Sequence, residues 1–162
     1  MVKTLILIFC LLSWGLEAPP VIATSSITLS QSHKEEPPEF SKDALWCYIL
    51  EKGILHPEIV FSQAVLETGN FTSRIFRENH NLFGMKLAKV RPTVATGEQY
   101  RHATYCSWQD SVNDYLLWQQ MWQKTPIDTE HHYYTLLDRL YAEDQDYVKI
   151  VKLVRKQNYE LI

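Results

Sequence analysis

The chain has 162 residues, 46% of them hydrophobic and 22% charged, which is the composition of a globular protein and excludes global disorder. With 16 Lys and Arg against 19 Asp and Glu, the net charge is −3. A mildly acidic chain lacks the basic excess of a general nucleic-acid binder, so we expect no nucleic-acid partner. The length fits one domain with additional terminal segments.

The chain begins with the pattern of a secretory signal peptide, which we assign to residues 1–23. An apolar run at 4–16 (TLILIFCLLSWGL) is shorter than the roughly 20 residues that span a membrane, but it fits the apolar part of a signal. Cleavage after Ala18 is less favoured because Pro19 follows it directly. We therefore expect an exported protein, periplasmic or alternatively secreted, with no stable membrane insertion after cleavage.

Export changes the interpretation of the cysteines. Cys10 lies in the signal peptide, which leaves Cys47 and Cys106 as an even pair in an oxidising compartment. This pair predicts a Cys47–Cys106 disulfide that joins the first helix to the end of a β region. Two buried free thiols are the alternative interpretation.

Residues 24–40 are rich in Ser and Thr and contain Pro37 and Pro38, and they show no apolar periodicity. They read as a linker or disordered leader. The folded domain is then 41–162, which is long enough for one modest core.

The remaining chain predicts a mainly helical α+β fold, with about six helices and one small β lobe. Capping Ser or Thr residues, Pro at a first helical position and Gly after a last one mark the helix ends. The predicted helices run from the Ser41 cap to Gly53, over 57–67, over 73–80 with Thr72 or Ser73 at the start, over about 110–124, from a cap at 128 or 129 to 140, and over about 146–158. Residues 84–106 contain Pro92, Gly97 and several β-branched residues, which favours two short strands or an irregular hairpin.

Glu67 is the residue that fits a plain amphipathic helix least well. Val60 and Ala64 share its helical face, so its side chain is expected to face inward or to line a cleft. It also lies at a helix C-terminus, where the macrodipole disfavours an anion. Both effects predict a raised pKa, which is what the general acid of glycoside cleavage requires. An exposed Glu at a frayed helix end is the alternative.

Several segments of the chain resemble the bacterial glucosaminidase family, in the same order and over about 41–155. The matching segments are 62–69 (SQAVLETG), 72–74 (TSR), 79–86 (NHNLFGMK), 105–115 (YCSWQDSVNDY) and 141–147 (YAEDQDY). In the family, an apolar helix ends in Glu-Ser/Thr-Gly and is followed by Asn-Leu-Phe-Gly-Ile/Met-Lys. The last segment departs from the family pattern, because Glu143 and Gln145 replace a Thr and a Pro.

The resemblance implies a lysozyme-like fold and the activity of an endo-β-N-acetylglucosaminidase, as in autolysins and flagellar cell-wall hydrolases. Such an enzyme cleaves the β-1,4 bond after N-acetylglucosamine in peptidoglycan. Glu67 falls on the catalytic acid of the family, and Tyr141 on an active-site tyrosine that positions substrate or water. The second carboxylate comes from the β lobe, where Glu98 is the candidate. The acetamido group of the substrate and a water held by Tyr141 are the alternatives to Glu98.

Four further residues are expected to bind substrate: Asn81, Phe83, Trp108 and Tyr147. Tyr115, Trp118 and Trp122 lie on one helix face and are predicted to belong to the core. Asp110 is predicted to be an N-cap.

The sequence predicts no metal site and no cofactor. His131 and His132 are adjacent and therefore point apart on a helix, and the chain contains no His-Glu-x-x-His motif. The expected partner is the glycan strand of peptidoglycan, bound by a monomer. Two other functions stay open: an N-acetylmuramidase activity on the same fold, and a non-catalytic module that binds glycans.

Overall fold

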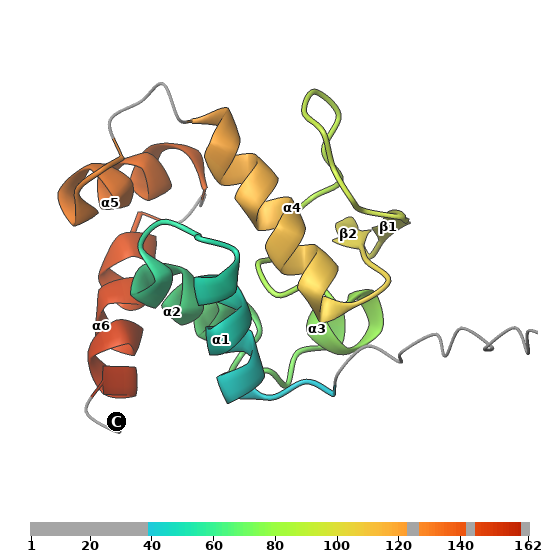
Figure 1. Ribbon diagram of the computed structural model, residues 1–162, viewed down its shortest axis with the longest axis horizontal. Coiled ribbons are helices and arrows are strands. Elements are labelled where there is room, and N and C mark those ends of the chain that lie inside the picture. Colours follow the sequence, from blue (N-terminus) through green and yellow to red (C-terminus); the bar gives the residue numbers. More distant parts are fainter. Residues whose placement is uncertain (1–38, 123–126, 142–144, 160–162) are drawn as a thin grey trace, which may run out of the picture. The chain divides into compact units, whose positions relative to one another are not determined.

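The computed structural model describes residues 39–122, 127–141 and 145–159 (Figure 1). The predicted signal peptide, residues 1–23, lies outside these ranges, and so does the predicted leader except for its last two residues. The described elements are α1 (Lys42–Glu51), α2 (Pro57–Glu67), α3 (Arg74–Asn79), β1 (Gly97–Gln99), β2 (His102–Thr104), α4 (Trp108–Met121), α5 (Glu130–Leu140) and α6 (Tyr147–Tyr159). The prediction of a mainly helical fold with a small β lobe is confirmed.

Side chains of Ser and Thr cap four of these helices, as the sequence predicts for three of them. Ser41, Ser73, Ser107 and Thr129 each accept a hydrogen bond from a backbone N–H in the first turn of α1, α3, α4 and α5. The predicted start of α4 is wrong by two residues. Asp110 is not the N-cap but lies in the first turn, where its N–H donates to the Ser107 hydroxyl and its carboxylate complements the helix dipole.

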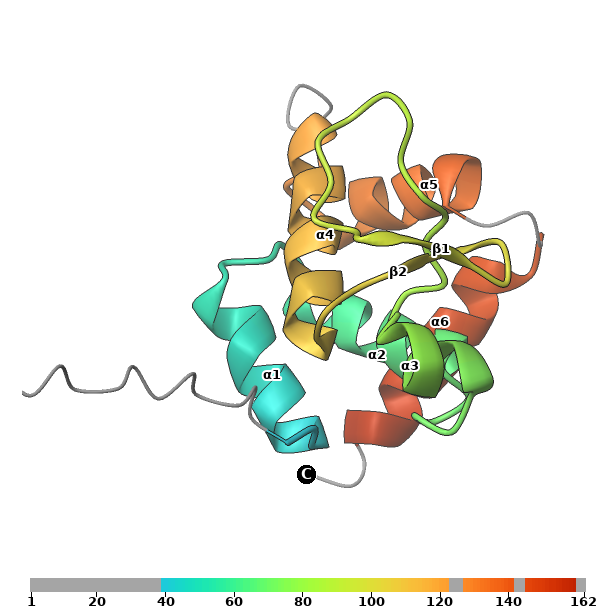
Figure 2. The same ribbon diagram turned by 90° about the vertical axis from the view of Figure 1, so that its right-hand side faces the viewer.

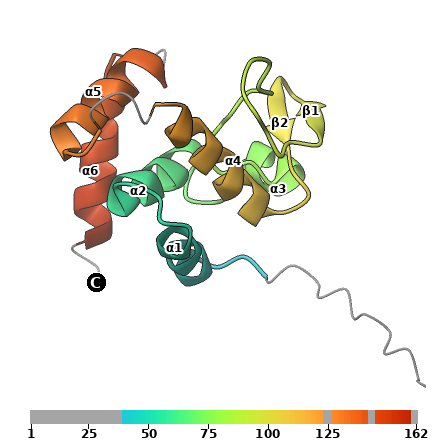
Figure 3. The ribbon, with the colours of Figure 1, turned by 45° about the horizontal axis from the view of Figure 1, so that its top comes forward.

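Helix α2 occupies the centre of the domain. It packs against α1 and α6, and Figures 1 and 3 show it between α6 and α4. Residues Ile59, Val60, Ser62, Gln63 and Ala64 are buried, so α2 carries polar as well as apolar side chains into the core. The predicted aromatic stripe on α4 is confirmed: Tyr115 and Trp118 are buried, and Trp122 packs against the same core.

The β lobe is one short antiparallel hairpin that lies next to α3 (Figure 2). Its register pairs Gly97 with Thr104, Glu98 with Ala103 and Gln99 with His102. The turn residues both have positive φ, 54° at Tyr100 and 63° at Arg101, a conformation that usually favours Asn and Gly. The Tyr100 hydroxyl donates to Glu78 of α3 at 2.7 Å, and the Arg74 guanidinium lies 4.0 Å from the centroid of the Tyr100 ring. Contacts to α3 therefore hold the turn in place.

Phe40, the last residue of the predicted leader, belongs to the packed domain. Its ring centroid lies 4.9 Å from that of Phe71, 4.7 Å from that of Phe76 and 5.8 Å from that of Trp108. The folded region therefore begins at least one residue earlier than predicted.

The predicted disulfide is not formed, and Cys47 and Cys106 are both free and exposed. Leu45 and Ile49, two positions on either side of Cys47, are fully buried. A residue midway between them on a helix points to the opposite side, so Cys47 faces solvent. The alternative of two buried thiols is wrong as well, because both thiols are on the surface. Within the described ranges, no helix is long and apolar enough to cross a membrane.

Candidate functional site

A cleft of about 850 Å³ lies at the C-terminal end of α2. One wall is the segment that follows α3, and the other comes from α4, the end of α5 and the start of α6. The described lining residues are Glu67, Phe83, Gly84, Met85, Lys86, Leu87, Ala88, Lys89, Val90, Arg91, Trp118, Met121, Arg139, Leu140, Tyr141 and Tyr147. Glu67 is the single carboxylate among these described residues.

Burial raises the pKa of Glu67 above its usual range. A hydrogen bond from the Tyr147 hydroxyl and the nearby charge of His102 both act in the opposite direction, but burial outweighs them. The direction predicted from the sequence is therefore confirmed, with burial as the main cause. A carboxyl group that retains its proton beyond the normal pH range suits proton donation.

The floor of the cleft connects Glu67 to a buried chain of hydrogen bonds. The Gln63 amide donates from Nε2 to the Tyr147 hydroxyl at 2.9 Å and accepts at Oε1 from the Tyr115 hydroxyl at 2.6 Å. The Tyr115 hydroxyl lies 2.6 Å from that of Tyr133, which accepts from Nε2 of Gln119 at 2.8 Å. Residues of α2, α4, α5 and α6 thus form one polar network inside the core.

Gly84 allows the opposite wall to approach Glu67. Its φ of +63° lies in the left-handed region, which favours glycine. A Cβ atom at this position would lie 2.8 Å from the Glu67 carboxylate oxygen Oε2. The glycine is therefore required both by the backbone conformation and by the close approach to Glu67.

Asn81 shapes this wall from behind and does not line the cleft. It is buried, and its Nδ2 donates to the carbonyl groups of Met85 and Ala103, both at 2.9 Å. Its Oδ1 accepts from the backbone N–H of Phe83 at 3.2 Å and of Met85 at 3.1 Å. One side chain thus fixes the turn around Gly84 and ties it to strand β2.

Tyr141 lines the cleft, but its hydroxyl donates to the backbone carbonyl of Phe83. Its ring stacks on that of Tyr147, with centroids 5.7 Å apart and an interplanar angle of 28°. These contacts connect the turn around Gly84 to the start of α6. In this structure Tyr141 holds two walls of the cleft together.

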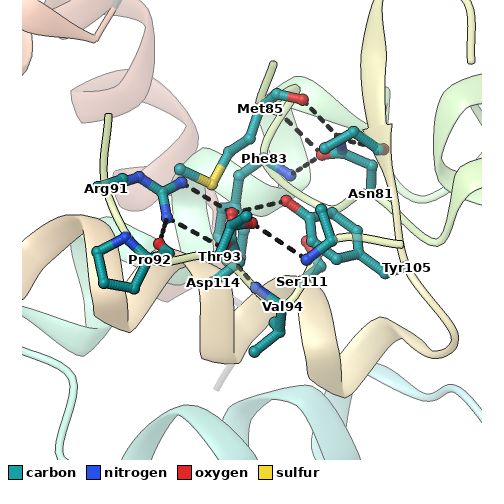
Figure 4. Close-up of polar contacts among 12 residues, drawn as sticks. Asn81, Phe83, Met85, Arg91, Pro92, Thr93, Val94, Tyr105, Ser111 and Asp114 are labelled. Atoms are coloured by element: carbon teal, nitrogen blue, oxygen red, sulfur yellow. Dashed lines mark hydrogen bonds and ion pairs between the residues drawn. The ribbon is translucent and has the colours of Figure 1, made fainter. Parts of the chain in front are cut away.

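A buried ion pair anchors the segment between Met85 and the hairpin (Figure 4). Arg91 donates to both carboxylate oxygens of Asp114 on α4, at 3.0 and 2.8 Å, and the two side chains are 7% and 0% exposed. The Tyr105 hydroxyl and the N–H of Val94 donate to the same carboxylate. Burial alone would raise the pKa of Asp114, but Arg91 and the side-chain hydrogen bonds of Thr93 and Tyr105 lower it below its usual range.

The structure brings four of the predicted site residues together, since Glu67, Phe83, Tyr141 and Tyr147 all line the cleft. Glu98 does not: it is exposed on β1 and absent from the lining. The hairpin register pairs Gln99 with His102, so Glu98 lies on the opposite face of the hairpin from His102. Its role as second acid stays a prediction.

The prediction that Trp108 binds substrate is not supported by its position. The side chain is 6% exposed, and its ring packs edge-on against Phe40 at 5.8 Å and Tyr48 at 5.5 Å. At the first residue of α4 it faces α1, which makes it a core residue outside the cleft.

Sequence reasoning missed the roles of Gln63, His102 and the Arg91–Asp114 pair. A signal existed for Gln63, because a polar residue four positions before Glu67 shares its buried helix face. No local pattern identified the other three residues. In the described part of the chain, no group of three or more His, Cys, Asp or Glu residues could hold a metal ion.

Comparison with protein families gives a match over residues 47–160 to the model of the Glucosaminidase family, described as mannosyl-glycoprotein endo-beta-N-acetylglucosaminidase. Among curated proteins, Protein bax from Escherichia coli (strain K12) is 38% identical over 72 residues. Those residues are 44% of this chain and 26% of that protein, so the match spans about a quarter of the relative.

Two solved structures are similar to the described domain. One chain from a type VI secretion system effector–immunity complex of Pseudomonas protegens has a TM-score of 0.52 and 21% identity, over 72% of this chain and 86% of that one. The catalytic domain of the autolysin Auto from Listeria monocytogenes has a TM-score of 0.49 and 18% identity, over 75% of this chain and 86% of that one. The first of these establishes a shared fold.

Proposed function

The chain belongs to the glucosaminidase family of glycoside hydrolases, and from this premise we propose that it cleaves the β-1,4 bond after N-acetylglucosamine in peptidoglycan. The observation that carries the proposal is the half-buried carboxyl group of Glu67, with its raised pKa, in a cleft of about 850 Å³. The choice of peptidoglycan rests on the resemblance to autolysin domains and on the predicted export.

In the proposed reaction Glu67 protonates the oxygen of the leaving sugar. Burial keeps this carboxyl group protonated to a higher pH than an exposed glutamate, and general acid catalysis supplies roughly 10²–10⁴-fold in rate. The lining of the cleft also includes residues 83–91, Trp118 and Tyr141. A glycan strand laid along it would present a glycosidic oxygen to Glu67.

The group that acts on the other face of the sugar is either Glu98, the acetamido group of the substrate or a water held by Tyr141. Glu67 is the single acid among the described lining residues, which favours a group that the substrate or water supplies. Glu98→Gln separates these mechanisms. Normal turnover by this variant would assign the role on the other face of the sugar to the acetamido group or the water. A large loss of turnover with retained binding of chitooligosaccharide would assign that role to Glu98.

Digestion of purified peptidoglycan tests the reaction. The products are reduced and analysed by mass spectrometry, and we expect N-acetylglucosamine at the new reducing end. N-Acetylmuramic acid at that end would replace the proposal by a muramidase activity. Absence of any product from the wild type, with retained affinity for glycan, would indicate a binding module.

Glu67→Gln tests the acid in the same assay. The substitution keeps the size of the side chain and removes its transferable proton, so we expect a loss of roughly 10²–10⁴-fold in kcat/KM from a folded protein. Hydrolysis by this variant at nearly the wild-type rate would contradict the assignment of Glu67.

We also propose that the protein is exported and acts as a monomer, as its N-terminal sequence and family suggest. N-Terminal sequencing of the protein recovered from the periplasm or medium should start at residue 24, and size-exclusion chromatography with light scattering should give one copy. A mature chain that retains residues 4–16 would contradict the signal-peptide interpretation.

A further inference from the structure

The hydrogen bonds of the buried network beneath Glu67 all donate in one direction. Gln119, at the end of the network farthest from Glu67, sets this direction. The backbone N–H of Leu55 donates to Oε1 of Gln119 at 3.0 Å, and Nε2 of Gln119 donates to the Leu55 carbonyl at 2.9 Å. A backbone N–H can only donate and a carbonyl can only accept. The amide of Gln119 therefore has one orientation, with Nε2 turned to the Tyr133 hydroxyl at 2.8 Å.

The orientation of Gln119 determines each hydrogen bond that follows, because a tyrosine hydroxyl has one proton. Tyr133 accepts from Gln119, so its own proton goes to the Tyr115 hydroxyl 2.6 Å away. Tyr115 in turn donates to Gln63 at 2.6 Å, which requires an oxygen at that position of the Gln63 amide. Nε2 of Gln63 then faces the Tyr147 hydroxyl and donates to it at 2.9 Å.

The proton of Tyr147 is consequently left to point into the cleft that Tyr147 and Glu67 both line, where hydrogen bonding to the Tyr147 hydroxyl lowers the pKa of Glu67. A reversed Gln63 amide would have the opposite effect: Tyr147 would donate to Gln63, and Glu67 would keep its bond to Tyr147 only by donating its own proton. An acid whose proton is held in that way cannot transfer it to a leaving oxygen. The orientation of the buried Gln63 amide thus determines whether the Glu67 proton is available for the substrate.

We propose that Gln63 is a positioning residue that holds the Tyr147 hydroxyl as a permanent donor to Glu67 and so leaves the Glu67 proton free for the substrate. The role of Glu67 as acid is that of the proposed function, on which this inference rests. Gln63 is fully buried one helical turn before Glu67 and has both ends of its amide bonded. Its action on Glu67 passes through Tyr147 alone.

The expected effect on Glu67 follows from this geometry. A fixed donor stabilises the carboxylate, so its loss should raise the Glu67 pKa further. Tyr147→Phe removes the donor, and Gln63→Met lets the Tyr147 hydroxyl turn and accept a proton from neutral Glu67. Both substitutions should therefore raise the pKa. Because Gln63 acts through Tyr147, the double variant should have the pKa of Tyr147→Phe alone.

The test is an NMR titration of the Glu67 carboxyl carbon in ¹³C-labelled protein, combined with the pH profile of kcat/KM. We expect a higher Glu67 pKa in Gln63→Met and in Tyr147→Phe, with the high-pH limb of the profile moved the same way. Tyr48→Phe is the matched control, since it also removes one side-chain hydrogen bond, to Asn113, but lies outside the network. It should leave the pKa unchanged.

An unchanged Glu67 pKa in Gln63→Met, or additive shifts in the double variant, would overturn the proposal. If Gln63→Met does not fold, Tyr147→Phe still tests the donor without adding a charge, and an unchanged Glu67 pKa in that variant would overturn the proposal. The titration needs no substrate. Failure of the wild type to cleave peptidoglycan would therefore refute the proposed function without affecting this test.

Discussion

The two sides of the cleft are built in different ways. The floor beneath Glu67 consists of four helices whose buried polar groups bond to one another from Leu55 to Tyr147. The facing wall, residues 84–96, contains no helix or strand, and Val90 within it is 94% exposed. The floor therefore determines the chemical properties of the acid, whereas a few anchoring contacts determine the shape of the wall.

This difference has an energetic consequence. In the floor, each polar group is one of several in a shared network, so the loss of one group should change the pKa of Glu67. In the wall, the Arg91–Asp114 pair and the amide of Asn81 each hold several backbone groups on their own. Substitutions in the two regions should consequently separate changes in pKa from changes in cleft shape.

The largest effect is expected at the anchor of the wall. Asp114→Asn leaves the guanidinium of Arg91 buried without its counter-ion, and breaking a buried pair costs about 3–5 kcal/mol of unfolding free energy. Urea denaturation of the wild type and of Asp114→Asn measures this loss of unfolding free energy. Glu78→Gln, in the exposed pair with Arg74, is the matched control and should cost much less, because solvent screens the pair. Equal losses in both variants would refute the special role of the buried pair.

The same pair predicts a pH dependence. The pKa of Asp114 is lower in the folded protein than its usual value. Its contribution is therefore fully present above the usual pKa of 3.8 and is lost as the pH falls through the lower folded value. The difference in unfolding free energy between wild type and Asp114→Asn should shrink over that acidic range. A difference that stays constant down to the lowest pH would contradict the assignment.

Gly84→Ala tests the contact between wall and floor. A left-handed φ costs an L-residue about 1–2 kcal/mol, and the added Cβ would also meet the Glu67 carboxylate at 2.8 Å. Gly53→Ala is a matched control with the same φ of +63° and no atom within 4 Å. Both variants should lose similar stability, but only Gly84→Ala should lose most of its glycan cleavage. Comparable activity in the two variants would rule out the close approach.

A smaller effect is expected from Glu67→Gln on stability, and it has the opposite sign. The folded pKa of Glu67 is raised, so its ionisation opposes folding: the wild type loses stability as the pH rises from the usual value of 4.5 through the folded pKa. The Gln variant has no such loss. Glu67→Gln should therefore have a higher unfolding free energy than the wild type at neutral pH. Below pH 4.5 it should have no such advantage, as urea denaturation at both pH values would show. Lower stability at neutral pH would contradict the burial of the carboxylate.

The smallest effect is expected at the cysteines. Both thiols are free and exposed, so Cys47→Ser and Cys106→Ser should each change the unfolding free energy by less than about 0.5 kcal/mol. Reduction with dithiothreitol should not lower the melting temperature. A lower melting temperature after reduction would restore the disulfide that the sequence predicted.

Much of the fold was predictable because helix ends are marked locally. Ser41, Ser73 and Thr129 bond to backbone groups three residues away, so their effect is visible within one turn of sequence. The start of α4 was misplaced because Ser107 and Asp110 are both good N-cap residues. Only the extended backbone of Ser107, with φ of −148°, distinguishes them.

The order of the helices, the place of the hairpin, the family motifs and the direction of the Glu67 pKa shift could all be predicted from the sequence. Each depends on residues a few positions apart or on a motif read directly from the chain. The surroundings of Glu67, in contrast, depend on how distant segments pack in the folded domain. Gln63 and Tyr147 are 84 residues apart and Arg91 and Asp114 are 23 apart, while Glu98 and Cys47 face solvent. Such contacts arise from how the helices pack, because side chains from distant segments meet only once the core has formed.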